Sequence, residues 1–163
     1  MSAIQTYSLF FSILCIALIT GLFYGYSCSV NPGLAALDDK EYLKAMQSIN
    51  KAILNPLFFI SFIGSLIILP LTAWFLYSPP LTTKFYCLLF STVIYIFGVF
   101  MVTMFANVPL NTILADFSID TATVSEISSQ RLRFEASWNT FHSIRTVAAV
   151  ISLSLSIIAT LIK

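Results

Sequence analysis

Four stretches of the chain are long, apolar and almost free of charge: residues 7–26, 54–77, 85–106 and 144–162. A helix needs roughly 20 apolar residues to cross the hydrocarbon core of a bilayer. Strands that are not closed into a barrel cannot satisfy their backbone hydrogen bonds in lipid, so we expect helices here. The pattern therefore predicts an all-α integral membrane four-helix bundle that forms a single domain over residues 1–163.

The composition agrees with a chain that is covered by a lipid bilayer. Hydrophobic residues make up 58% of the sequence, charged residues only 9%, and the mean hydropathy is +0.92. Soluble domains carry roughly 25% charged residues. A net charge of +1 provides no basic surface for nucleic acid. The three cysteines lack the spacing of a zinc site, so no metal is expected.

Four spans place both chain ends and the short connection 78–83 on one side of the membrane. The two long connections, 27–53 and 107–143, then share the opposite side, together with all acids, asparagines and arginines and the single histidine. This predicts a polar cap or polar-lined mouth there. Most lysines and arginines also lie on that side, so the positive-inside rule places it in the cytoplasm. A bacterial protein of this kind would lie in the plasma (inner) membrane.

The first long connection is expected to contain an amphipathic helix. Asp38 can cap its start and Glu41 can complete a capping box. The apolar side chains then recur at helical spacing, at Tyr42, Met46, Ile49 and Ile53. Such a helix would lie on the membrane or over the bundle mouth, with Asn50 near its end.

The second long connection is expected to end in a helix that continues into the fourth span. Thr123 and Glu126 can cap the start of this helix. Some forty residues at 1.5 Å each would give roughly 58 Å, about twice the hydrocarbon thickness. The first half of this extended fourth helix must therefore stand outside the lipid.

Three local motifs favour structural interpretations. Gly21 and Gly25 form a GxxxG pair, which predicts close helix packing inside the bundle. Asn55 precedes Pro56, which is typical of an N-cap residue followed by a proline at the first position of a helix. Asn107, two residues before another proline, is expected to end the third span, with Asn111 beyond the resulting turn.

The strongest indication of function is the segment that leads into the fourth span. Trp138, His142 and Arg145 follow one another at spacings of four and three, so they share one helix face, with Asn139 beside it. Ionisable groups at that depth are costly and usually functional.

Several motifs, in this order within a four-span chain, resemble the anthrone oxygenase-like family, formerly classed as a domain of unknown function. They are Gly21-Leu-Phe-Tyr-Gly25, Val30-Asn-Pro-Gly33, Met46-x-x-x-Asn50, Asn55-Pro56, Asn107-Val-Pro-Leu-Asn111 and Trp138-Asn139-x-x-His142-x-x-Arg145. Characterised members of that family are fungal enzymes that oxidise polyketide anthrones to anthraquinones. The resemblance implies a cofactor-independent monooxygenase with molecular oxygen as co-substrate.

Oxidation of an anthrone needs a base, donors for the developing oxyanion and a flat apolar pocket. His142 is the candidate base, because only imidazole has an unperturbed pKa near neutrality. The candidate catalytic residues are thus His142, Arg145, Asn139 and Asn111, and the candidate substrate-binding residues are Trp138, Asn107, Asn50 and Met46. Trp138 could stack on an aromatic substrate.

Two other classes of function fit the same sequence. The protein could bind a quinone or a lipid without chemistry, or it could be a structural membrane protein whose polar residues tie the long connections together. A transporter is disfavoured, because the span interiors lack buried ionisable groups. The oligomeric state stays open.

Overall fold

The computed structural model describes residues 2–162, which form helices and connections without a strand. The elements in chain order are α1 (Ala3–Gly25), η1 (Tyr26–Val30), α2 (Asn31–Ala35), α3 (Asp39–Ala52), α4 (Pro56–Phe75), α5 (Thr83–Ile94), η2 (Tyr95–Met101), η3 (Thr103–Asn107), α6 (Val108–Ala115) and α7 (Val124–Leu161). The η elements are π-helical segments that join their neighbours without a break. Four long helices in the described chain are apolar enough to cross a membrane: Ala3–Ala35, Pro56–Phe75, Thr83–Ala115 and Val124–Leu161. The predicted all-α architecture with four spans is confirmed.

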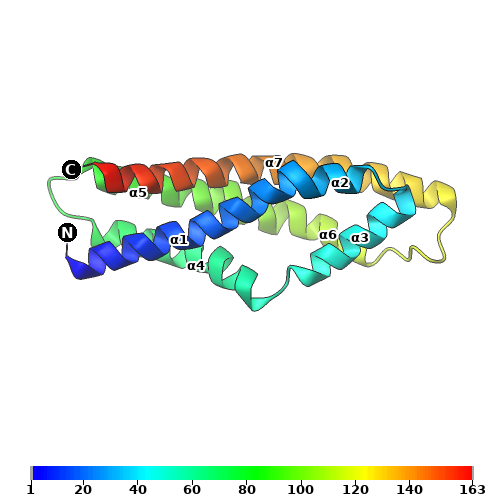
Figure 1. Ribbon diagram of the computed structural model, residues 1–163, viewed down its shortest axis with the longest axis horizontal. Coiled ribbons are helices and arrows are strands. Elements are labelled where there is room, and N and C mark those ends of the chain that lie inside the picture. Colours follow the sequence, from blue (N-terminus) through cyan, green and yellow to red (C-terminus); the bar gives the residue numbers. More distant parts are fainter. Residues whose placement is uncertain (1, 163) are drawn as a thin grey trace.

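The four long helices lie side by side, and α7 runs along the whole bundle (Figure 1). Both ends of the chain lie at one end of the bundle, near the connection between α4 and α5. At the opposite end, α2, α3 and α6 pack around the first half of α7. The polar cap therefore consists mostly of helices.

Two of the predicted helix starts are confirmed. The Asn55 side chain accepts a hydrogen bond from the Phe58 amide at 3.1 Å, one residue before α4 begins. Thr123 and Glu126 form a capping box at the start of α7, which then runs for 38 residues. This is the extended fourth helix that the sequence predicts.

The capping box predicted at Asp38 is wrong in its detail. Asp38 precedes α3 as its N-cap residue, but its side chain makes no capping hydrogen bond. Asp39 and Glu41 lie in the first turn instead. Their negative charges are favourable there, because the free amides of a helix start carry partial positive charge.

The turn predicted at Asn107 is also wrong. The chain stays helical from Thr83 to Ala115, and Asn111 lies inside α6. Proline lacks an amide hydrogen and normally disrupts a helix, but it is tolerated at a first turn. Pro109 lies in the first turn of α6, directly after the wider π-helical segment η3. The helix therefore changes its hydrogen-bond register there without ending.

The close helix contact lies at Gly98, and the prediction for Gly21 and Gly25 is wrong. A Cβ atom added at either of those two glycines would meet nothing within 4 Å. A Cβ atom at Gly98 would lie 2.6 Å from the Cβ atom of Ala148. Small residues allow such close approach of membrane helices. The seam between η2 and α7 is thus closely packed at Gly98.

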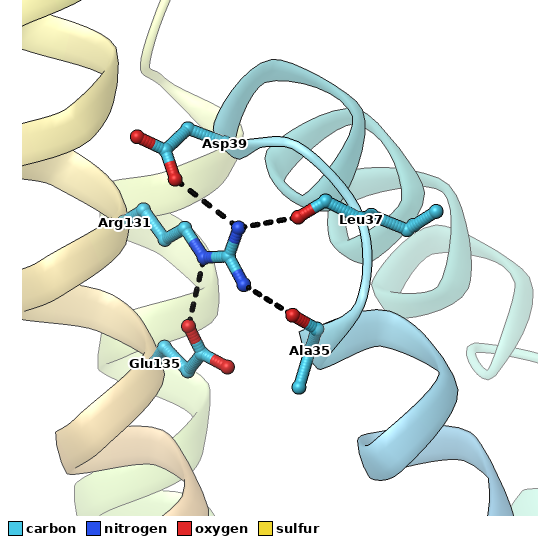
Figure 2. Close-up of polar contacts among 5 residues, drawn as sticks. All are labelled: Ala35, Leu37, Asp39, Arg131 and Glu135. Carbon is cyan, nitrogen blue, oxygen red and sulfur yellow. Dashed lines mark hydrogen bonds and ion pairs between the residues drawn. The ribbon is translucent and has the colours of Figure 1, made fainter.

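The cap is fixed to α7 by the guanidinium of Arg131 (Figure 2). Its Nη1 donates to the Leu37 carbonyl at 2.6 Å and to the Asp39 carboxylate at 3.1 Å. Its Nη2 donates to the Ala35 carbonyl at 3.1 Å, and its Nε to Glu135 at 2.8 Å. One side chain thereby holds the turn between α2 and α3 against α7, which sets the position of α3.

Candidate functional site

A cavity of about 800 Å³ lies at the membrane mouth of the bundle. Its wall is built from α1 and η1, from α3 with the link to α4, from η3 and α6, and from α7. Sites for small molecules usually have volumes of roughly 300–1,000 Å³. The wall is mostly apolar, and its amide-bearing and ionisable side chains are Gln47, Asn50, Lys51, Asn55, Asn107, Asn111, His142, Arg145 and the phenol of Tyr26.

His142 is held through both ring nitrogens. Arg145 reaches its Nδ1 with Nε at 3.2 Å and with Nη2 at 3.0 Å. The Ser27 hydroxyl lies 2.9 Å from its Nε2. A guanidinium can only donate, so Nδ1 must be the acceptor, and the neutral ring must carry its proton on Nε2. In this arrangement His142, which is only 1% exposed, has no free lone pair for a substrate proton.

Arg145 is a buried cation on the cavity wall, 8% exposed. Its third polar contact is long, 3.5 Å from Nη1 to the Thr103 hydroxyl. The ring of Phe23 covers its guanidinium at 4.4 Å. Among residues 2–162 no carboxylate pairs with Arg145, and no acid lines the cavity. A buried charge without a counter-ion is costly, and an anionic ligand would remove that cost.

Trp138 lines the cavity, and other aromatic rings stack on its indole. His142 stacks on it at 5.0 Å between ring centroids and 11° between planes. Phe134, one turn earlier on the same helix, stacks at 6.3 Å and 28°. The stacking of a substrate on Trp138 that the sequence suggested is therefore blocked in this arrangement.

Two predicted site residues orient Trp138. The Asn111 Oδ1 accepts from the indole Nε1 at 2.8 Å, and the Asn107 Nδ2 donates to the Trp138 carbonyl at 3.2 Å. The Asn107 Oδ1 and the Asn50 Nδ2 are buried without partners among the described residues. All three asparagines line the cavity.

The remaining two predicted site residues lie outside the cavity wall. Met46 is fully buried, and its sulfur accepts a hydrogen bond from the Tyr26 hydroxyl at 3.1 Å. Asn139 follows Trp138 on α7, and its Oδ1 is buried without a partner among residues 2–162. Their placement gives neither residue direct access to a ligand in the cavity.

Sequence reasoning missed Ser27, Phe23, Tyr26 and Lys51. Phe23 and Tyr26 cover Arg145 and His142 from α1 and η1, at 4.4 Å and 5.1 Å. Lys51 adds a second cation to the wall. Only the position of the two aromatic residues at the end of the first span could have indicated their role.

The fold and the site define a multi-pass membrane protein with a positively charged, largely apolar cavity at one mouth of its bundle. The family model described as anthrone oxygenase matches residues 57–155, which is more than half of the chain. The chain belongs to the anthrone oxygenase family. The match includes η3, α6 and the site residues of α7, whereas α1 and α3 lie outside it. No curated protein and no solved structure matches the chain.

Proposed function

We propose that this protein oxidises a hydrophobic aromatic substrate of the anthrone or hydroquinone class with molecular oxygen, without a resident cofactor. The observation that carries the proposal is Arg145, a buried cation without a carboxylate partner on the wall of an apolar cavity. Family membership supports the same chemistry.

Arg145 would bind the substrate oxygen that becomes negative when the substrate loses a proton. An anthrone has an acidic CH₂ group opposite its carbonyl, so deprotonation places the charge on the carbonyl oxygen. Hydrogen-bond donors placed at such an oxyanion stabilise it strongly in a site that excludes water. The amide NH₂ groups of Asn50 and Asn111 line the same cavity and could donate beside Arg145.

His142 becomes available as a base when Arg145 turns toward the substrate. The N–H groups that now occupy His142 Nδ1 would then donate to the oxyanion. Nδ1 would regain its lone pair, while Nε2 keeps its proton and its contact with Ser27 at 2.9 Å. Anion binding and proton acceptance are thereby coupled through one side chain.

For an anthrone, the reaction balances without a further reductant. The anthrolate gives an electron to oxygen, the carbon and oxygen radicals combine, and the O–O bond breaks with loss of water. One oxygen atom stays on the ring as the new carbonyl, the other leaves as water, and the CH₂ group supplies both hydrogens of that water. The four electrons that oxygen accepts all come from the substrate carbon.

The test follows oxygen uptake by the purified protein in detergent with emodin anthrone, beside a no-protein control for autoxidation. Arg145→Gln should lower kcat/KM by about 10²–10³, the usual loss for one oxyanion donor. His142→Ala should also lose turnover. Arg133→Gln is the matched control, because Arg133 lies on α7 outside the cavity and contacts Gln130. Retained uptake in a folded Arg145→Gln variant would contradict the proposal.

A quinone-binding role without chemistry is the second candidate. The same buried guanidinium could hold a quinone oxygen in the apolar cavity. That function predicts reversible binding of oxidised and reduced rings, with no oxygen uptake above the control. A binding assay beside the uptake assay therefore separates the two.

A further inference from the structure

The rim of the cavity contains apolar side chains from helices that enter the membrane. Leu22 of α1, Leu54 of the α3–α4 link and Val108 of α6 all line the cavity and are 41%, 66% and 39% exposed. A residue that both lines a cavity and is exposed lies at its opening. The three residues lie close to the ends of the first three apolar stretches, which places this part of the opening at the edge of the hydrocarbon layer.

The other part of the rim is polar. Lys51, at the end of α3, and Thr112 of α6 also line the cavity and are exposed. They lie in segments that extend beyond the apolar stretches. The opening is therefore a slot between α1, the α3–α4 link and α6, with an apolar end toward lipid and a cationic end toward the headgroups.

We infer that the cavity is loaded sideways, from the lipid leaflet, through the slot bordered by Leu22, Leu54 and Val108. Its occupant is the neutral, hydrophobic aromatic substrate, which is dissolved in the bilayer and loses its proton only inside the cavity. Such a molecule would slide its rings past the apolar border while its carbonyl oxygen moves from Lys51 at the rim to Arg145 inside. The inference rests on the proposed function for the identity of the occupant, but the slot can be tested without turnover.

Two features support a lipid-side route. The wall contains two cations and no acid, which suits a substrate whose oxygen becomes negative inside the cavity and disfavours a cation. A flat apolar molecule also concentrates in the bilayer, because transfer of apolar surface out of water is favourable. An opening toward the leaflet therefore gives the substrate access from the phase in which its concentration is highest.

The fluorescence of Trp138 can report whether lipid reaches the cavity through this slot. The chain has two tryptophans, and Trp74, which is 73% exposed on α4, can be replaced by Phe. Trp138 then reports alone from the cavity wall, although only 3% of it is exposed. Vesicles that contain phosphatidylcholine with brominated chains would quench it by contact if lipid reaches the cavity, whereas iodide would quench it from water.

In the Trp74→Phe background we expect brominated lipid to quench Trp138 more strongly than iodide. Val108→Phe should narrow the slot and reduce that quenching, because the larger ring fills part of the opening that Val108 borders. Met104→Phe is the matched control, since Met104 is exposed on the adjoining η3 segment and does not line the cavity. It should leave the quenching unchanged.

Quenching by iodide alone would overturn the inference, because the cavity would then open only to water. Quenching by lipid that Val108→Phe and Met104→Phe change equally would also overturn it, because the contact would lie elsewhere. Absence of oxygen uptake together with slot-dependent quenching would contradict the proposed oxidation and leave the lateral slot standing.

Discussion

The seam between η2 and α7 offers the sharpest test of the packing. A Cβ atom at Gly98 would lie 2.6 Å from the Cβ atom of Ala148. Non-bonded carbons prefer roughly 3.5–4.0 Å, so Gly98→Ala would force the two helices apart by about 1 Å. Overpacking of this kind usually costs about 1–3 kcal/mol. We expect Gly98→Ala to lower the free energy of unfolding by that amount.

The control for this prediction is Gly21→Ala. Nothing lies within 4 Å of a Cβ atom at Gly21, so this change adds a methyl group without a clash. Alanine favours a helix over glycine by about 1 kcal/mol, so Gly21→Ala should be neutral or stabilising. Unfolding by sodium dodecyl sulfate in mixed micelles, followed by far-ultraviolet circular dichroism, measures both variants.

A double variant shows whether the clash is the cause. Ala148→Gly removes the methyl group that Gly98→Ala would meet. The combination of both changes should recover most of the loss, giving a coupling energy of about 1–3 kcal/mol, as expected for residues in contact. The reasoning is refuted if Gly98→Ala is as stable as Gly21→Ala, or if Ala148→Gly fails to rescue it.

Three further predictions concern the cap. Arg131→Lys should lose about 1–3 kcal/mol, because one ammonium cannot replace the four hydrogen bonds of the guanidinium, and hydrogen exchange in α3 should accelerate. Asn111→Ala should release the Trp138 indole N–H and shift its fluorescence in the Trp74→Phe background, and an unchanged spectrum would contradict the 2.8 Å hydrogen bond. Lys44, through its hydrogen bond and its charge, lowers the pKa of the Asp120 carboxyl. Asp120 should therefore stabilise the cap at neutral pH and lose this effect as acid protonates it, so Asp120→Asn should matter at pH 7 and not below the carboxyl pKa, as measured by melting against pH.

Composition and helical periodicity were sufficient to predict the four spans, the amphipathic α3 and the extended α7. These depend on transfer to lipid and on local capping, which act within one segment. Two failures are local, because Asp38 makes no capping hydrogen bond and the helix does not end at Asn107. The third concerns a contact between segments. The sequence marks Gly21 and Gly25 as a packing motif, but whether a glycine faces a neighbour depends on the rotation of the helix. Gly98 is the glycine at which an added Cβ atom would clash with another helix.

In the candidate site, too, local spacing was predictable from the sequence, whereas contacts between distant segments were not. The shared face of Trp138, His142 and Arg145 follows from helical spacing, and the structure brings these three together. Ser27 lies 115 positions from His142 in the chain, and no local pattern predicts their contact. The sequence also cannot show that Arg145 occupies the Nδ1 atom of His142, because that depends on side-chain rotamers.

The site and the packing seam are coupled because both lie on α7, a continuous helix without an internal proline. Arg131 fixes the rotation of α7 at the cap, and Ala148 fixes it against Gly98 within the membrane. Arg145 lies between these two points, one turn before Ala148. A helix held by its own hydrogen bonds cannot turn at Arg145 alone, so a shift of about 1 Å at Gly98 should displace the guanidinium from the cavity wall. Misplacement on this scale can cost about 10²-fold in rate. Gly98→Ala should therefore lower turnover as well as stability, and Ala148→Gly should restore both together.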